Sequence, residues 1–182
     1  MRGEACALSL NFFARPPDVS RPPGDDRALD SMFRSGEKDG GFALLDAGWT
    51  VIDGCAAARA LIKFFTDAGG VMYSGSLIIP FATCSWVAKF QAAEVGVTGI
   101  REAFALDRHL ADGGSLEEWG IDTSAPLISP GEKVPPRPNP ADAIEWDAQF
   151  PDHPLSRVRR GLSDLQTITV ITDEAKRLPA FS

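Results

Sequence analysis

Carboxylates are the commonest groups in this sequence that could do chemistry. Glu94 and Glu102 flank a glycine-containing turn, and Glu117 and Glu118 precede Asp122. Two carboxyl groups can act as general acid and general base when their surroundings shift one pKa relative to the other. These pairs support one hypothesis, a carboxylate-based hydrolase. Acidic residues at strand ends and turns are equally typical of a solvated surface.

Histidine and cysteine chemistry has little support. Catalysis through Ser-His-Asp or Cys-His geometry needs a histidine beside the nucleophile, and the chain has only His109, late in a predicted helix, and His153, at a helix start. The 3 cysteines are widely spaced and form no Cys-x-x-Cys pair, so we expect neither zinc nor a disulfide framework. We predict no catalytic residue, no cofactor and no metal ion; a metal cluster would have to consist mostly of carboxylates.

The segment EVGVTGIR, residues 94–101, predicts a turn followed by the first turn of a helix. Gly99 would supply backbone freedom, Thr98 a helix cap, and Arg101 a positive charge. Because a helix N-terminus presents free N–H groups to anions, these three residues form a candidate anion-binding site. A carrier of a small ligand or anion is therefore a further hypothesis. The phosphate-binding patterns Gly-x-Gly-x-x-Gly and Gly-Lys-Ser/Thr are absent, so the segment also fits a plain structural corner.

Three aromatic residues lie in otherwise polar stretches beside a proline-rich segment: Trp119, Trp146 and Phe150. Large rigid rings supply much buried area at a low entropy cost, which makes them common anchors for protein partners. We take these residues as a candidate partner-binding site. The alternative is that the rings hold the proline-rich segment against the domain.

Charge and hydropathy restrict the possible partners. The net charge is −7 and the pI about 4.8, so no long-range field attracts nucleic acid or anionic lipid. The basic run at Arg157, Arg159 and Arg160 is typical of a solvated helix face. No window approaches the roughly 18 apolar residues of a membrane span. The N-terminal run MRGEACALSLNFF lacks the features of a secretory signal, so we expect a soluble, cytoplasmic protein.

The chain length of 182 residues corresponds to a single domain, residues 1–182. Two stretches rich in proline, glycine and charge, at about 15–41 and 122–140, are predicted to be long loops. The first has room for a short helix at 25–34.

Between and after these loops the patterns predict an antiparallel meander with helices. Asp53-Gly54 joins two apolar runs and is the dipeptide that a two-residue hairpin favours. Ile100, Ala103, Phe104 and Leu110 fall on one helical stripe. The predicted elements are a hairpin in 48–65, strands at 71–81 and 84–92, helices at 100–111 and from Pro154, and a strand at 167–172. Together they predict an α+β domain in which helices pack on an antiparallel sheet.

The runs GWTVIDGCAAARALIKFF, GVMYSGSLIIP and CSWVAKFQAAE, followed by HPLSRVRRGLSDLQTITVI, resemble in their order the PsbP-like, Mog-type α/β/α sandwich family. The resemblance covers roughly residues 42–110 and 153–172. It implies a non-catalytic binding or assembly module, with no catalytic residues to transfer. Our first functional expectation is therefore a protein-binding module, such as an accessory or immunity-type protein of a bacterial secretion system.

Overall fold

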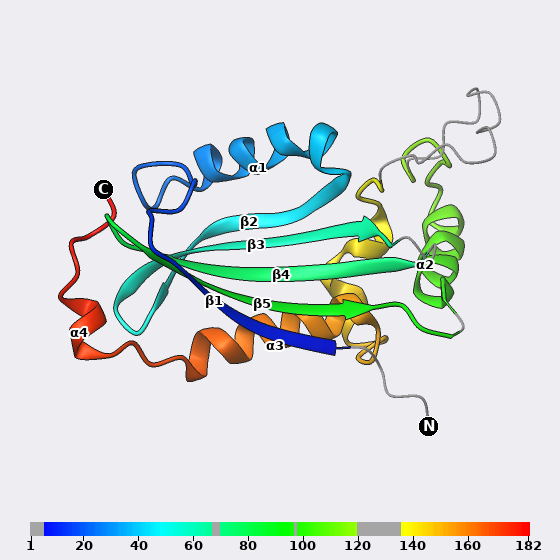
Figure 1. Ribbon diagram of the computed structural model, residues 1–182. Helices are drawn as coiled ribbons and strands as arrows, with labels where there is room; N and C mark the ends of the chain where they lie inside the picture. Colours follow the sequence, from blue (N-terminus) through cyan, green and yellow to red (C-terminus); the bar gives the residue numbers. More distant parts are fainter. Residues whose placement is uncertain (1–5, 67–69, 97, 120–135) are drawn as a thin grey trace.

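The computed structural model describes residues 6–66, 70–96, 98–119 and 136–182 (Figure 1). One antiparallel sheet has the strand order β1-β5-β4-β3-β2. The strands are β1 (Cys6–Phe13), β2 (Phe42–Ile52), β3 (Cys55–Phe65), β4 (Val71–Pro80) and β5 (Ser85–Ala93). The helices are α1 (Asp26–Gly40), α2 (Ile100–Ala111), α3 (Pro154–Ile168) and α4 (Asp173–Lys176), with the 3-10 helices η1 (Pro140–Asp142) and η2 (Ile144–Asp147) before α3. The predicted α+β fold is confirmed.

The predicted hairpin is β2 and β3. Ile52 pairs with Cys55, and the turn between them has positive φ at Asp53 (46°) and Gly54 (83°). This is the backbone that an Asp-Gly turn allows and that suits the twist of the flanking strands.

The core lies between the sheet and α3. Leu155, Val158 and Leu162 recur at helical spacing and are buried against β4 and β5. Gly75 on β4 permits this approach, because a Cβ there would lie 2.5 Å from Leu162 Cδ1. Full burial of one such leucine contributes roughly 1.5–3 kcal/mol.

α1 covers the opposite face of the sheet. Ala57 belongs to the core under α3 whereas Ala58 contacts the cluster around Leu29 of α1, and successive side chains of a strand point to opposite faces. α1 replaces most of the long loop predicted at 15–41 and extends beyond the short helix at 25–34. Asp25 caps its start by accepting the N–H of Ala28 at 3.0 Å. The prolines that favoured a loop all precede residue 25, so they do not interrupt the helix.

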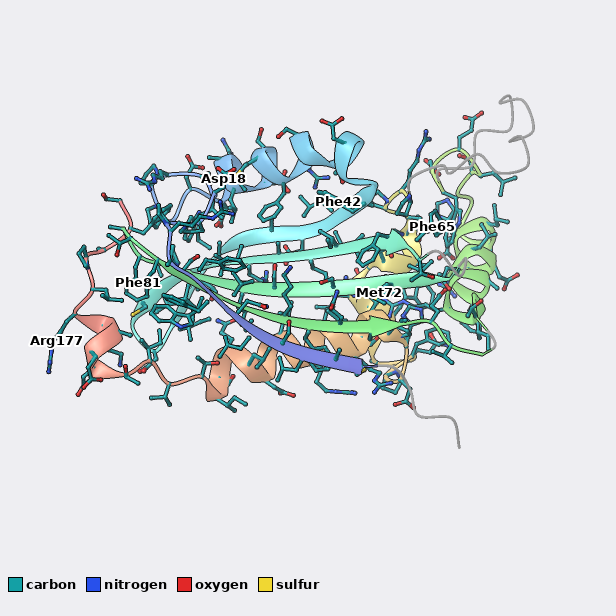
Figure 2. The ribbon with its side chains drawn as sticks, viewed as in Figure 1. Asp18, Phe42, Phe65, Met72, Phe81 and Arg177 are labelled. Atoms are coloured by element: carbon teal, nitrogen blue, oxygen red, sulfur yellow. The ribbon has the colours of Figure 1, made fainter. Side chains whose placement is uncertain are left out.

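The strand predicted at 167–172 is wrong. α3 continues to Ile168, and the backbone N–H of Ile171 donates to the carboxylate of Asp53 (2.8 Å) instead of to a strand. The chain then passes through α4 and returns to the sheet, where Ala180 pairs with Phe81 (Figure 2). Strand propensity measures the fit to a half-buried sheet surface, and no sheet surface receives residues 167–172.

α2 begins and ends where the sequence predicts, but its predicted buried face is wrong. Ile100, Phe104 and Leu110 are exposed by 57%, 50% and 44%, whereas Arg101 and Ala105 are buried. The expected Thr98 cap is also absent: Gly99 occupies the capping position with φ 78°, and no side chain caps the helix.

Candidate functional site

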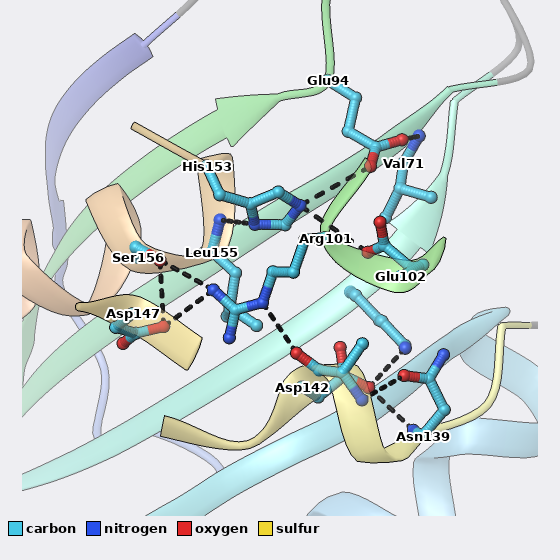
Figure 3. A network of polar contacts seen from close by, with 12 residues as sticks. Val71, Glu94, Arg101, Glu102, Asn139, Asp142, Asp147, His153, Leu155 and Ser156 are labelled. Carbon is cyan, nitrogen blue, oxygen red and sulfur yellow. Dashed lines mark hydrogen bonds and ion pairs between the residues drawn. The ribbon is translucent and has the colours of Figure 1, made fainter. Parts of the chain in front are cut away.

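Three acid-base side chains meet at one end of the sheet (Figure 3). Glu94 follows β5, Glu102 lies in the first turn of α2, and His153 precedes α3. His153 Nε2 lies 3.8 Å from Glu94 Oε1 and 3.6 Å from Glu102 Oε1. Both distances exceed the roughly 3.2 Å of a good hydrogen bond, so the contacts are ion pairs when His153 is protonated.

The ring of His153 is oriented by the start of α3. Pro154 occupies the first helical position, and His153 Nδ1 accepts the N–H of Leu155 at 3.2 Å. His153 is thus the N-cap residue of α3, and an N-cap side chain typically contributes about 1 kcal/mol. Since Nδ1 accepts a hydrogen bond, the neutral ring carries its proton on Nε2, toward the two glutamates.

The surroundings of this cluster shift three pKa values. Burial alone would lower the pKa of His153, but the carboxylates of Glu102 and Glu94 outweigh burial and raise it above 6.5. Burial alone would raise the pKa of Glu102, but His153, the backbone and Arg101 together lower it below 4.5. Burial, reinforced by nearby carboxylates, raises the pKa of Tyr73, whose ring packs edge-on against His153.

Arg101 is the polar centre of the structure around the cluster. Its side chain is fully buried, and its Nε donates to Ala141 O at 2.7 Å. One terminal nitrogen donates to Asp147 (2.8 Å) and Ser156 (2.7 Å), and the other donates to Ala143 O (2.9 Å). These bonds connect α2 to η1, η2 and α3, and they use the guanidinium group for internal contacts.

Further ion pairs surround Arg101. Asp147 also accepts from Arg159 at 2.9 Å. Buried Lys63 of β3 donates to Asp142, whose carboxylate also accepts the backbone N–H of Asn139 at 2.8 Å and closes a capping box on η1. The region after the predicted loop at 122–140 is therefore fixed to the sheet by charge; residues 122–135 themselves lie outside the described residues.

A cavity of about 370 Å³ adjoins two of the three acid-base residues, Glu94 and His153. Glu94 and His153 form part of its wall, together with Thr98, Gly99 and Phe150. All three residues of the predicted anion site, Thr98, Gly99 and Arg101, line this cavity, but the guanidinium group of Arg101 makes the internal contacts described above.

The aromatic residues predicted to bind a partner are only partly exposed at the surface. Trp119 is 8% exposed and packs with Ala105 and Ala141, so it is not offered to a partner in this structure. Trp146 and Phe150 are half-buried and lie together, with ring centres 6.3 Å apart. Trp146 Nε1 donates to Pro140 O at 3.2 Å, which holds the aromatic ring against η1.

The most exposed apolar surface of the sheet was missed by the sequence reasoning. β1 is an edge strand that pairs with β5, and Leu8, Leu10 and Phe12 on one face are exposed by 59%, 72% and 57%. Their alternation with Ser9 and Asn11 is a strand signal that the sequence contains.

The carboxylate prediction had mixed outcomes. Glu94 and Glu102 do converge, whereas Glu118 lies near His109 on the surface and its carboxylate accepts the N–H of Ser115. His153 joins the first pair through the fold alone, because 51 or more residues separate it from either glutamate.

No protein-family model, curated protein or solved structure matches this sequence. In the described part of the chain, no helix has both the length and the apolar character needed to cross a membrane.

Proposed function

We propose that this protein is a non-catalytic binding module that accepts an extended strand of another protein along β1. The observation that carries the proposal is the uncovered edge of β1, where Leu8, Leu10 and Phe12 are more than half exposed. β1 contains no charged residue. A long apolar edge without charges is the kind of edge that pairs with a further strand.

The chemistry of the edge defines the partner segment. Strand addition uses main-chain hydrogen bonds for affinity and alternate side chains for specificity. The partner would place apolar side chains beside Leu8, Leu10 and Phe12, and small or polar ones beside Ser9 and Asn11 on the other face. An extended segment with alternating apolar residues fits this description.

The net charge of −7 favours a different protein over a second copy, because two such chains repel each other. An accessory or immunity-type protein of a bacterial secretion system is the concrete form of this proposal, since such a protein acts by binding.

Affinity capture with charge-introducing variants tests the proposal. Leu10→Asp places a charge in the exposed edge, and Val51→Asp does the same at a 63% exposed position on β2, the opposite edge of the sheet. The wild type and Val51→Asp should capture the same proteins in similar amounts. Leu10→Asp should capture at least about tenfold less of them, because it disrupts a central contact. The retained protein must then protect the backbone amides of β1 from hydrogen exchange. Equal capture by both variants, or a wild type that is a stable dimer, contradicts the proposal.

A carboxylate-based hydrolase is the second candidate, because Glu94 and Glu102 converge beside a cavity. Hydrolysis of model esters, phosphoesters or glycosides that disappears in Glu94→Gln would favour it. Activity unchanged in that variant would remove Glu94 from consideration.

A further inference from the structure

We propose that Glu94, Glu102 and His153 bind a divalent transition-metal cation at the wall of the 370 Å³ cavity. The proposal departs from our expectation of no metal ion, and it is independent of the β1 edge. It rests on the arrangement of the three side chains, on their unpaired atoms and on the charge around them.

The three ligand atoms are spaced around a common centre. One atom from each of Glu94, Glu102 and His153 lies within 4.8 Å of the others. Zinc bonds of about 2.0–2.1 Å in tetrahedral geometry place ligand atoms about 3.3 Å apart. The distances of 3.6 and 3.8 Å from Nε2 to the two carboxylates are slightly longer, and the two carboxylate oxygens lie within 4.8 Å of each other, so the three ligands must move closer together to hold the ion.

The cluster contains buried polar atoms without partners. The side chain of His153 is only 10% exposed, and its Nε2 has no hydrogen-bond partner. Oε2 of Glu102 is likewise buried and unpaired. Because most buried polar atoms in folded proteins are hydrogen-bonded, these two orphan atoms call for a missing group. A cation would bind the nitrogen and the carboxylates together.

The charge of the surrounding network also favours a cation. Among the described residues, the ion pairs around the cluster contain four carboxylates and, when His153 is neutral, three cationic side chains. The carboxylates are Glu94, Glu102, Asp142 and Asp147, and the cations are Lys63, Arg101 and Arg159. Buried charge without compensation is costly, so a cation beside Glu94 and Glu102 is stabilised.

Hydrogen bonds from neighbouring groups hold two of the proposed ligands in place. One of these bonds should break when the metal ion binds. Glu94 Oε2 accepts the N–H of Val71 at 3.3 Å, which fixes its other oxygen toward His153. Ligation through Nε2 moves the neutral proton of His153 to Nδ1, where it displaces the N–H of Leu155. Metal binding should therefore accelerate hydrogen exchange at the Leu155 amide.

The donor set selects the class of metal. Imidazole suits zinc and its first-row neighbours, whereas magnesium and calcium prefer oxygen alone. We therefore expect Zn²⁺ to bind more tightly than Mg²⁺. Three protein ligands leave at least one position for water, which the cavity can supply.

Calorimetric titration of Zn²⁺ into the chelator-treated full chain, with the thiols reduced, tests the site. His153→Asn removes the ligand but keeps a side chain that can cap α3. Glu102→Gln removes a charge with little change of shape. Each variant should weaken Zn²⁺ binding at least about 100-fold, because even residues that only hydrogen-bond to metal ligands typically change metal affinity by about 10–100-fold. His109→Asn, which changes the other histidine of the chain, and Leu10→Asp should leave binding unchanged.

Wild-type protein that binds no Zn²⁺, or wild-type-like binding in both ligand variants, would overturn the proposal. Circular dichroism establishes that the variants are folded. Should either be unfolded, the absorption spectrum of Co²⁺ added to the wild type decides: bands of a four- or five-coordinate protein site support the proposal, and the spectrum of hydrated Co²⁺ contradicts it.

Discussion

α3 and α2 are attached to the rest of the protein by different forces. α3 buries Leu155, Val158 and Leu162 against the sheet. α2 buries one large side chain, the cation Arg101, and leaves Ile100 and Phe104 at least half exposed. Apolar packing is non-directional, whereas the bonds of Arg101 fix both distance and angle. The charged attachment therefore sets the orientation of α2, and with it the position of Glu102 opposite His153.

Of the variants that test this comparison, Arg101→Ala should cause the largest loss of stability. Removing one partner of a buried ion pair leaves unpaired groups behind and typically costs about 3–5 kcal/mol. Asp147 keeps Arg159 as a partner, but the carbonyls of Ala141 and Ala143 lose their donor. Urea unfolding measures the loss. Arg108→Ala, on the same helix and 66% exposed, is the control and should change stability by less than about 0.5 kcal/mol. Equal effects of the two variants would show that charge does not attach α2.

Leu155→Ala should have the next largest effect, because it removes a fully buried side chain from the apolar attachment of α3. A loss of roughly 3 kcal/mol is expected from lost burial and the resulting cavity. The same denaturant titration measures it. A loss below about 1 kcal/mol would mean that α3 does not depend on its apolar face.

Phe104→Ala should cost less, about 1 kcal/mol. Its ring is 50% exposed and contacts Trp146 and Phe150 at centroid distances of 6.1 and 5.9 Å, and such aromatic pairs contribute about 0.5–1.5 kcal/mol beyond their buried area. Thermal unfolding measures the difference from the wild type. A loss as large as that of Leu155→Ala would show that α2 is attached through its apolar face.

Asp53→Asn should have the smallest effect and a defined pH dependence. Hydrogen bonds from Lys176 and Ile171 lower the pKa of Asp53 below 3.8, and the Asp53 carboxylate raises the pKa of Lys176 above 10.5. The lowered pKa of the carboxyl group stabilises the folded protein above about pH 3.8. The raised pKa of the lysine stabilises it below about pH 10.5. The wild type should therefore be slightly more stable than the variant between these values, and the two should converge in acid. Melting temperatures of both proteins across the pH range measure this difference in stability. A difference that grows as the pH falls would contradict the assigned role of Asp53.

The sequence predicted the elements whose signals are local. Asp53-Gly54 located the β2–β3 hairpin, and Pro154 located the start of α3. The burial of Arg101 could not be predicted, because its partners Asp147 and Ser156 lie at least 46 residues away in the chain. For the same reason the Glu94 and Glu102 pair could be named, but His153 could not be added to it.

Other errors came from ranking one local signal above another. The prolines before residue 25 outweighed the spacing of Leu29, Met32 and Phe33, which face the sheet from α1. In residues 167–172 β-branched composition favoured a strand, whereas Ile168 and Val170 are 69% and 81% exposed. Composition indicates what a segment can form, and the available neighbours decide what it does form.

Hydrogen exchange of the protein with and without its captured partner tests the central claim most directly. The exposed faces of β1 and of α2 are two surfaces of the described residues that could receive a partner. The account predicts slower exchange in residues 6–13 on binding, with α2 unchanged, because an added strand bonds to the free edge of β1. Protection confined to α2 and the region of Trp146 and Phe150, with β1 unchanged, would contradict it.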